Sequence, residues 1–144
     1  MYQHHIRIFT ASKMRHAEQM RDLREKYPDI YFTARWPVTA PLASEAQRPV
    51  YQWMGDAFSD ILNSDVVMLY AEKGKHLKTA LVHVGYAIAA GKPIYVIGEH
   101  ESYAEWQFYE GVVYRAPTID RAIRNIRTKF RNVKPLILRG ANPS

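Results

Sequence analysis

The sequence predicts a single α/β domain, in which a mainly parallel sheet of about five strands lies between two layers of helices. Three observations support this fold class. The chain has 144 residues, which is the usual length of one domain. Short runs of β-branched and aromatic residues alternate with amphipathic segments, which is typical of parallel sheets joined by right-handed crossovers. The run DVVMLY, residues 65–70, is almost wholly apolar, as expected for a strand buried on both faces.

The first half of the chain is expected to supply two strands and two helices. A β-rich run within residues 4–12 predicts the first strand. Apolar residues at three-residue spacing predict a helix over residues 14–26, which ends before Pro28. The segment DIYFTARW, residues 29–36, predicts a second strand, and the three prolines of residues 37–49 predict a loop. A helix from Val50 follows, because apolar side chains recur along one face at Trp53, Ala57 and Ile61.

The second half repeats this alternation. Residues 77–90 predict an apolar helix closed by Gly91, and residues 93–98 predict another buried strand. The run GVVYR, residues 111–115, predicts a fifth strand, and an amphipathic helix from Ile119 to Phe130 follows it. We expect one domain over residues 1–133 and an extended C-terminal tail over residues 134–144.

Composition argues against several classes of protein. The chain has no cysteine, so disulfides and thiolate metal sites are ruled out and a cytoplasmic location is the simplest expectation. No run approaches the roughly 18 apolar residues of a membrane helix, and we expect no membrane contact. His76 and His83 lie two helical turns apart and cannot chelate one metal without other ligands. We therefore expect neither a metal nor a cofactor.

Positive charge is concentrated at the C-terminal end. Residues 115–144 contain eight lysines and arginines and one aspartate, a net charge of +7, so the rest of the chain carries about −1. Such a run fits the solvated face of a terminal helix, and it also fits a surface that contacts nucleic acid or an acidic partner. The arginines that would make the second kind of contact are Arg121, Arg124, Arg127 and Arg131.

Ligands of parallel sheets bind outside the carboxyl ends of the strands. Three segments after predicted strands therefore hold candidate ligand-binding residues. These residues are Thr10, Ser12, Lys13, Arg15, Glu72, Lys75 and Gly98. Hydroxyls and cations at the start of a helix suit an anion such as a phosphate. The alternative is that Thr10 or Ser12 only caps the following helix.

His83 and two carboxylates are the candidate catalytic residues. His83 lies within the apolar helix, where an imidazole serves either as a general base or as a hydrogen-bonded interior residue. Asp56 and Asp60 are four residues apart and share a helix face, so they either assist His83 or simply solvate the helix. Asp65 begins a strand, which predicts a structural role at the opposite edge of the sheet.

Aromatic residues follow the second and fourth predicted strands. Trp36 and Trp106 are well placed to hold a flat base between their rings, since base–aromatic stacking is worth roughly 1–3 kcal/mol per base. Phe108 and Tyr109 fit two interpretations: they stack on a base in the same way, or they fill core or subunit contacts.

Taken in order, several segments resemble the nucleoside 2-deoxyribosyltransferase-like family, and most closely its small phage and bacterial members. The segments are FTASKMRHAEQMRDLR, FTARW, DILNSDVVMLYAE, HLKTALVHVGYAIAAGKPIYVIGEH and YAEWQFYEGVVYR. The resemblance covers about residues 6–125. It implies a flavodoxin-like (Rossmann-like) sheet, a nucleoside or nucleotide substrate, and cleavage of the bond between sugar and base. It also implies homo-oligomers in which one subunit helps to complete another's site.

The sequence departs from the family pattern at the position of the nucleophile. The family carries a glutamate there, whereas this chain has His83. An imidazole is a poor substitute, because a glycosyl-imidazolium would place positive charge beside an electron-poor carbon. It could instead activate water for direct hydrolysis. The acidic residue that the family usually has in the preceding loop is replaced within AEKGKHLK, and its aspartate matches either Asp56 or Asp60.

The sequence is compatible with three functions. The first is an N-glycosidase or deoxyribosyltransferase-like enzyme with His83 at the reaction centre and Asp56 or Asp60 assisting. The second is a catalytically inactive relative that binds a nucleotide-like anion. The third is nucleic-acid binding by the basic C-terminal helix.

Overall fold

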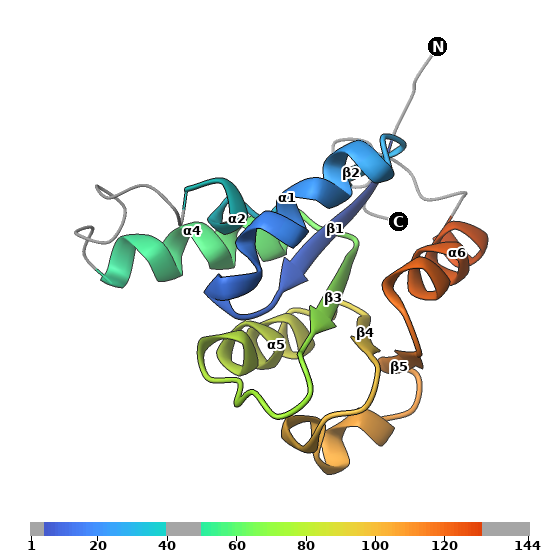
Figure 1. Cartoon of the computed structure of the whole chain (residues 1–144). Coiled ribbons are helices and arrows are strands. Elements are labelled where there is room, and N and C mark those ends of the chain that lie inside the picture. The colour runs from blue at the N-terminus through green and yellow to red at the C-terminus, as the bar shows by residue number, and fades with distance from the viewer. Residues whose placement is uncertain (1–4, 40–49, 131–144) are drawn as a thin grey trace, which may run out of the picture.

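The computed structural model describes residues 5–39 and 50–130. Five parallel strands form one sheet in the order β2-β1-β3-β4-β5 (Figure 1). Their bounds are Ile6–Ala11 for β1, Ile30–Phe32 for β2, Val66–Tyr70 for β3, Ile94–Ile97 for β4 and Val113–Ala116 for β5. The predicted three-layer, flavodoxin-like architecture is confirmed.

Helices cover both faces of the sheet. Their bounds are Ala17–Lys26 for α1, Trp36–Thr39 for α2, Val50–Leu62 for α4, Thr79–Ala89 for α5 and Ile119–Phe130 for α6. Side chains of α4 and α5 pack with one set of strand residues, and those of α1 and α6 pack with the other. Figure 1 shows α5 and α6 on opposite sides of the sheet.

The central strand β3 shows why this arrangement forms. Val67 and Leu69 belong to the core beneath α4 and α5, whereas Val66 and Met68 belong to the core beneath α1 and α6. Successive side chains of a strand point to opposite faces, so a strand that is apolar at every position needs a helix layer on each side. The apolar run in the sequence therefore dictates a sheet covered on both faces.

The N-terminal elements differ from the expected bounds. The second strand ends at Phe32, and Trp36 begins the short helix α2 instead of ending a strand. Proline fits the first turn of a helix, which explains why the chain turns helical at Trp36-Pro37. The helix expected from Met14 begins with a 3₁₀ turn, Met14–His16. Residues 37–39 of the expected loop are helical, and residues 40–49 lie outside the described part of the chain.

The aromatic segment after β4 forms two 3₁₀ turns, η2 at Glu101–Tyr103 and η3 at Glu105–Phe108. The predicted C-terminal tail, residues 134–144, lies outside the described residues. Within the described ranges, no helix is long and apolar enough to cross a bilayer.

Candidate functional site

A cavity of about 310 Å³ opens on the α4/α5 side of the sheet, beyond the carboxyl end of β1. This volume is within the range of small-molecule sites. Its polar and aromatic wall residues come from four places in the chain: Ser12 and Lys13 after β1, Arg35 and Trp36 at α2, Trp53, Asp56 and Asp60 on α4, and His76, Lys78, Thr79 and His83 at or before α5. The cavity therefore gathers several of the residues that the sequence nominated.

His83 forms part of the cavity wall and is only 8% exposed. Phe9 and Phe58 approach its ring edge-on, with ring centroids 5.5 Å and 6.5 Å away. The buried Nδ1 atom has no hydrogen-bond partner among the residues that the structure describes. Burial lowers the pKa of His83 to about 4, because an apolar environment disfavours the charged form. The imidazole is therefore neutral at pH 7.

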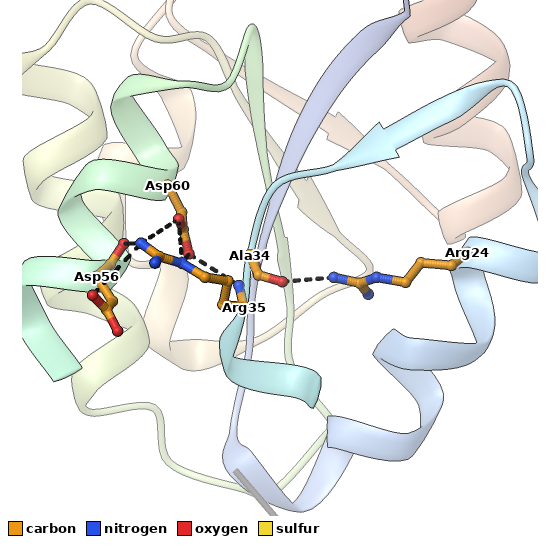
Figure 2. A network of polar contacts seen from close by, with 5 residues as sticks. All are labelled: Arg24, Ala34, Arg35, Asp56 and Asp60. Atoms are coloured by element: carbon orange, nitrogen blue, oxygen red, sulfur yellow. Dashed lines mark hydrogen bonds and ion pairs between the residues drawn. The ribbon is translucent and has the colours of Figure 1, made fainter. Parts of the chain in front are cut away.

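Asp56 and Asp60 differ sharply in their environments (Figure 2). The Asp60 side chain is 8% exposed and accepts hydrogen bonds from Arg35 N and Nε, each at 2.9 Å. Arg35 Nη2 lies 2.9 Å from the same carboxylate. The Asp56 side chain is 37% exposed, and its Oδ1 lies 3.6 Å from Arg35 Nη2. Asp60 therefore does more than face solvent, because it holds Arg35 in place. Asp56 is the more exposed of the two carboxylates in the cavity wall.

Trp36 and Trp53 are the tryptophans that line the cavity. Trp36 Nε1 donates a hydrogen bond to the carbonyl of Thr10 at 2.7 Å, which holds this side chain against the end of β1. The buried Nε1 atom of Trp53 meets no acceptor within the described ranges. Ser12 Oγ donates to the carbonyl of Tyr70 at 2.7 Å, so its hydroxyl joins the ends of β1 and β3.

Other residues predicted from the sequence do not line this cavity. Thr10 is fully buried within β1. Arg15 Nε lies 3.7 Å from Glu72 Oε2, and these two side chains form an exposed pair. Lys75 contributes its backbone carbonyl, which accepts a hydrogen bond from His100 Nε2 at 2.6 Å. Arg15, Glu72 and Lys75 therefore make local contacts in the segments that follow β1 and β3, whereas Thr10 is part of β1 itself.

Gly98 and Trp106 also lie elsewhere. Gly98 adopts a positive φ of 72°, which favours glycine, and it lines a separate groove on the α6 side of the sheet. Trp106 packs edge-on against Tyr103, with ring centroids 5.9 Å apart.

Several cavity residues were not nominated from the sequence. They are Arg35, Trp53, Met54, His76, Lys78 and Thr79. Arg35 contacts a residue 25 positions away in the chain, and no local spacing signals such a pair. Trp53 could have been found, because Trp53, Asp56 and Asp60 follow helical spacing and share one face of α4.

The arginines of α6 are partly engaged by carboxylates. Arg124 Nε lies 3.0 Å from Asp120 Oδ2, and Arg127 forms a two-pronged contact with Asp29 at 2.6 Å and 2.8 Å. Arg121 is exposed, and Arg131 lies outside the described residues.

Asp65 Oδ2 accepts a hydrogen bond from the backbone N–H of Arg7 at 2.9 Å, at the edge of the sheet opposite the cavity. Within residues 5–39 and 50–130, no cluster of histidines and carboxylates suits a metal ion.

No protein-family model matches the chain, and no curated protein matches it. Among solved structures, the chain is similar to the CMP N-glycosidase BcmB of Clostridium botulinum, with a TM-score of 0.55 at 14% sequence identity. The likeness covers 85% of this chain and 98% of that one. It shows that the two chains share a fold.

Proposed function

We propose that the cavity binds a nucleoside or nucleotide and that the chain hydrolyses the N-glycosidic bond between its sugar and base. The observation that carries this proposal is that one cavity brings together two indole rings, the partly exposed carboxylate of Asp56 and two lysines. The shared fold with a CMP N-glycosidase supports the same class of reaction.

The ligand's base and phosphate have separate partners in the cavity wall. Trp36 and Trp53 offer flat apolar surfaces on which a base can stack. Lys13 and Lys78 supply positive charge for a phosphate. The N-terminus of α5 adds partial positive charge, and its cap residue Lys78 makes no side-chain capping bond to the first amides.

Asp56 is the group that we assign to the chemical step. Its carboxylate takes a proton from a water molecule, and the water oxygen forms a bond to the anomeric carbon of the sugar. The bond from that carbon to the base nitrogen breaks, and the base leaves with the bonding electron pair. The proton passes from Asp56 to the departing base. Sugar and free base are the products, and the carboxylate returns to its starting state.

His83 takes a hydrogen-bonding part in this scheme. A neutral imidazole carries one N–H donor, and the buried, unpartnered Nδ1 leaves Nε2 as the ring nitrogen able to meet a ligand. Taking a proton would turn His83 into a buried imidazolium, which its apolar surroundings disfavour and whose Nδ1 has no partner among the described residues. We therefore assign Asp56, and not His83, to activate the water.

The test is release of free base. Wild-type protein is incubated with CMP, dCMP and a panel of other nucleotides and nucleosides, and the products are separated by chromatography. We expect base release by the wild type and a rate at least about 100-fold lower for Asp56→Asn, the usual loss for a general base. Asp29→Asn is the matched control, because Asp29 pairs with Arg127 away from the cavity. Wild-type release no faster than that of Asp56→Asn would refute the proposal.

Binding without turnover is the second candidate. It is favoured by His83, which stands where the resembled family has its nucleophilic glutamate, and by Arg35, which engages Asp60. Thermal unfolding with the same nucleotide panel separates the two functions. A ligand present at 100 times its Kd stabilises the folded protein by about 2.7 kcal/mol. Stabilisation without base release supports binding alone, and the absence of any shift counts against both candidates.

A further inference from the structure

Arg35 lies between two carboxylates that would otherwise repel each other. Asp56 and Asp60 are one turn apart on α4, where like charges destabilise a helix. Arg35 Nη2 lies 2.9 Å from Asp60 Oδ1 and 3.6 Å from Asp56 Oδ1. Figure 2 shows the guanidinium between the two side chains.

The two contacts are unequal. Asp60 is buried and binds the backbone N–H, Nε and Nη2 of Arg35, so this pair is held rigidly. Nη2 also donates a hydrogen bond to the backbone carbonyl of Asp56 at 3.3 Å. The Asp56 carboxylate is therefore near a cation whose position Asp60 sets, while it stays accessible to the cavity.

The backbone that carries Arg35 is also held in place. The carbonyl of the preceding residue, Ala34, accepts a hydrogen bond from Arg24 Nη2 at 2.6 Å (Figure 2). The following residue, Trp36, donates to the carbonyl of Thr10. Partners of this kind orient a reactive group through its neighbours.

We infer that Arg35 is a positioning residue, which Asp60 holds in place and which orients the Asp56 carboxylate toward the anomeric carbon of a bound nucleotide. This inference rests on the proposed hydrolysis. It goes further by giving Asp60 and Arg35 different roles from Asp56: Asp60 holds Arg35, and Arg35 acts through the Asp56 carboxylate. Misplacing a catalytic group by about 1 Å can lower a rate about 100-fold.

The experiment separates positioning from folding. Arg35→Gln leaves the Asp60 charge buried and unpaired, so we expect the Tm to fall by roughly 10 °C. The double variant Arg35→Gln/Asp60→Asn removes both charges, and its Tm should recover most of that loss. Because the contact of Asp56 with Arg35 is still missing, kcat for base release should stay about 100-fold below the wild-type value, with KM changed less than about threefold.

A purely structural role predicts another result. If the double variant regains the wild-type kcat together with its Tm, the inference is wrong. Arg127→Gln is the control, since it removes an arginine from an ion pair with Asp29 that is remote from the cavity, and it should leave kcat unchanged. A wild-type protein that releases no base would defeat the proposed function and this inference with it. An active wild type with an equally active double variant defeats the inference alone.

Discussion

His83 illustrates how the surroundings of a residue decide its chemistry. On sequence alone an imidazole at this position fits either a general base or an interior residue. The flanking rings of Phe9 and Phe58 and the loss of solvent lower its pKa to about 4. The side chain is therefore both buried and part of the cavity wall, and its imidazole is neutral at pH 7.

The first prediction concerns stability at acid pH. The His83 pKa is about 6.5 in the unfolded chain and about 4 in the folded protein. Between these pH values the unfolded state binds more protons than the folded state. The contribution of His83 to the free energy of unfolding is therefore fully present above pH 6.5 and is lost as the pH falls toward 4. The loss attributable to His83 should approach about 3 kcal/mol.

Urea unfolding of the wild type and His83→Phe at pH 7, 5 and 4 measures this effect. The variant should gain stability relative to the wild type as the pH falls. Burial also lowers the pKa of His16, but that residue is present in both proteins and its effect cancels. If the free energies of unfolding of the two proteins change with pH in the same way, His83 has the same pKa in the folded and unfolded states, and the prediction is wrong.

The second prediction concerns Trp53. If a base stacks on its ring, Trp53→Ala should weaken nucleotide binding about 10-fold or more, because stacking contributes roughly 1–3 kcal/mol. Trp53→Phe keeps an aromatic surface and should change the Kd less than about threefold. Calorimetric titration with CMP measures both constants. An unchanged Kd for Trp53→Ala would place the base elsewhere.

At the scale of elements, the loop between β3 and α5 is joined to the segment after β4. His100 Nδ1 accepts a hydrogen bond from the backbone N–H of Ser102 at 2.9 Å, so Nε2 carries the ring proton and donates it to the Lys75 carbonyl. His100 is buried. This imidazole thus anchors the loop that leads into the cavity-lining start of α5.

The third prediction follows from this contact. His100→Ala leaves the Lys75 carbonyl without that donor, and we expect a loss of about 1–3 kcal/mol in the free energy of unfolding. Urea denaturation at pH 7 measures it, with the exposed Glu110→Ala as the control. Equal stability of the two variants would mean that the loop is held by other contacts.

Elements with strong periodicity were predictable from the sequence, and their ends were less so. The apolar run before Tyr70 identified a central strand, because only a doubly covered strand is apolar at every position. Residues 33–36 look extended in composition, yet Arg35 turns toward Asp60 and Trp36 begins a helix. The turn of Arg35 toward Asp60 is a contact between residues 25 positions apart in the chain, which local propensity does not contain.

The candidate site was predictable only in part for a related reason. Strand order places ligands at the carboxyl edge of the sheet, but it does not say which face of the sheet a loop will meet. Lys13 lines the cavity on the α4/α5 side, whereas Gly98 lines the groove on the α6 side. Helical spacing identified Asp56 and Asp60 as candidate residues, whereas their different contacts with Arg35 are seen only in the structure.

At the scale of the whole molecule, topology determines where the cavity lies. The order β2-β1-β3-β4-β5 places the first crossover on one side of β1 and the later ones on the other. In such sheets a crevice forms where the direction of winding changes, between β1 and β3. Ser12 joins the ends of these two strands, and the next residue, Lys13, is part of the cavity wall.

The most direct test of the proposed function is a crystal structure of the Asp56→Asn variant with CMP. We predict that the base stacks on Trp36 and Trp53. The anomeric carbon should lie within about 3–3.5 Å of a water molecule held by residue 56. Density for CMP in the groove beside α6, or an empty cavity at saturating CMP, would contradict the account.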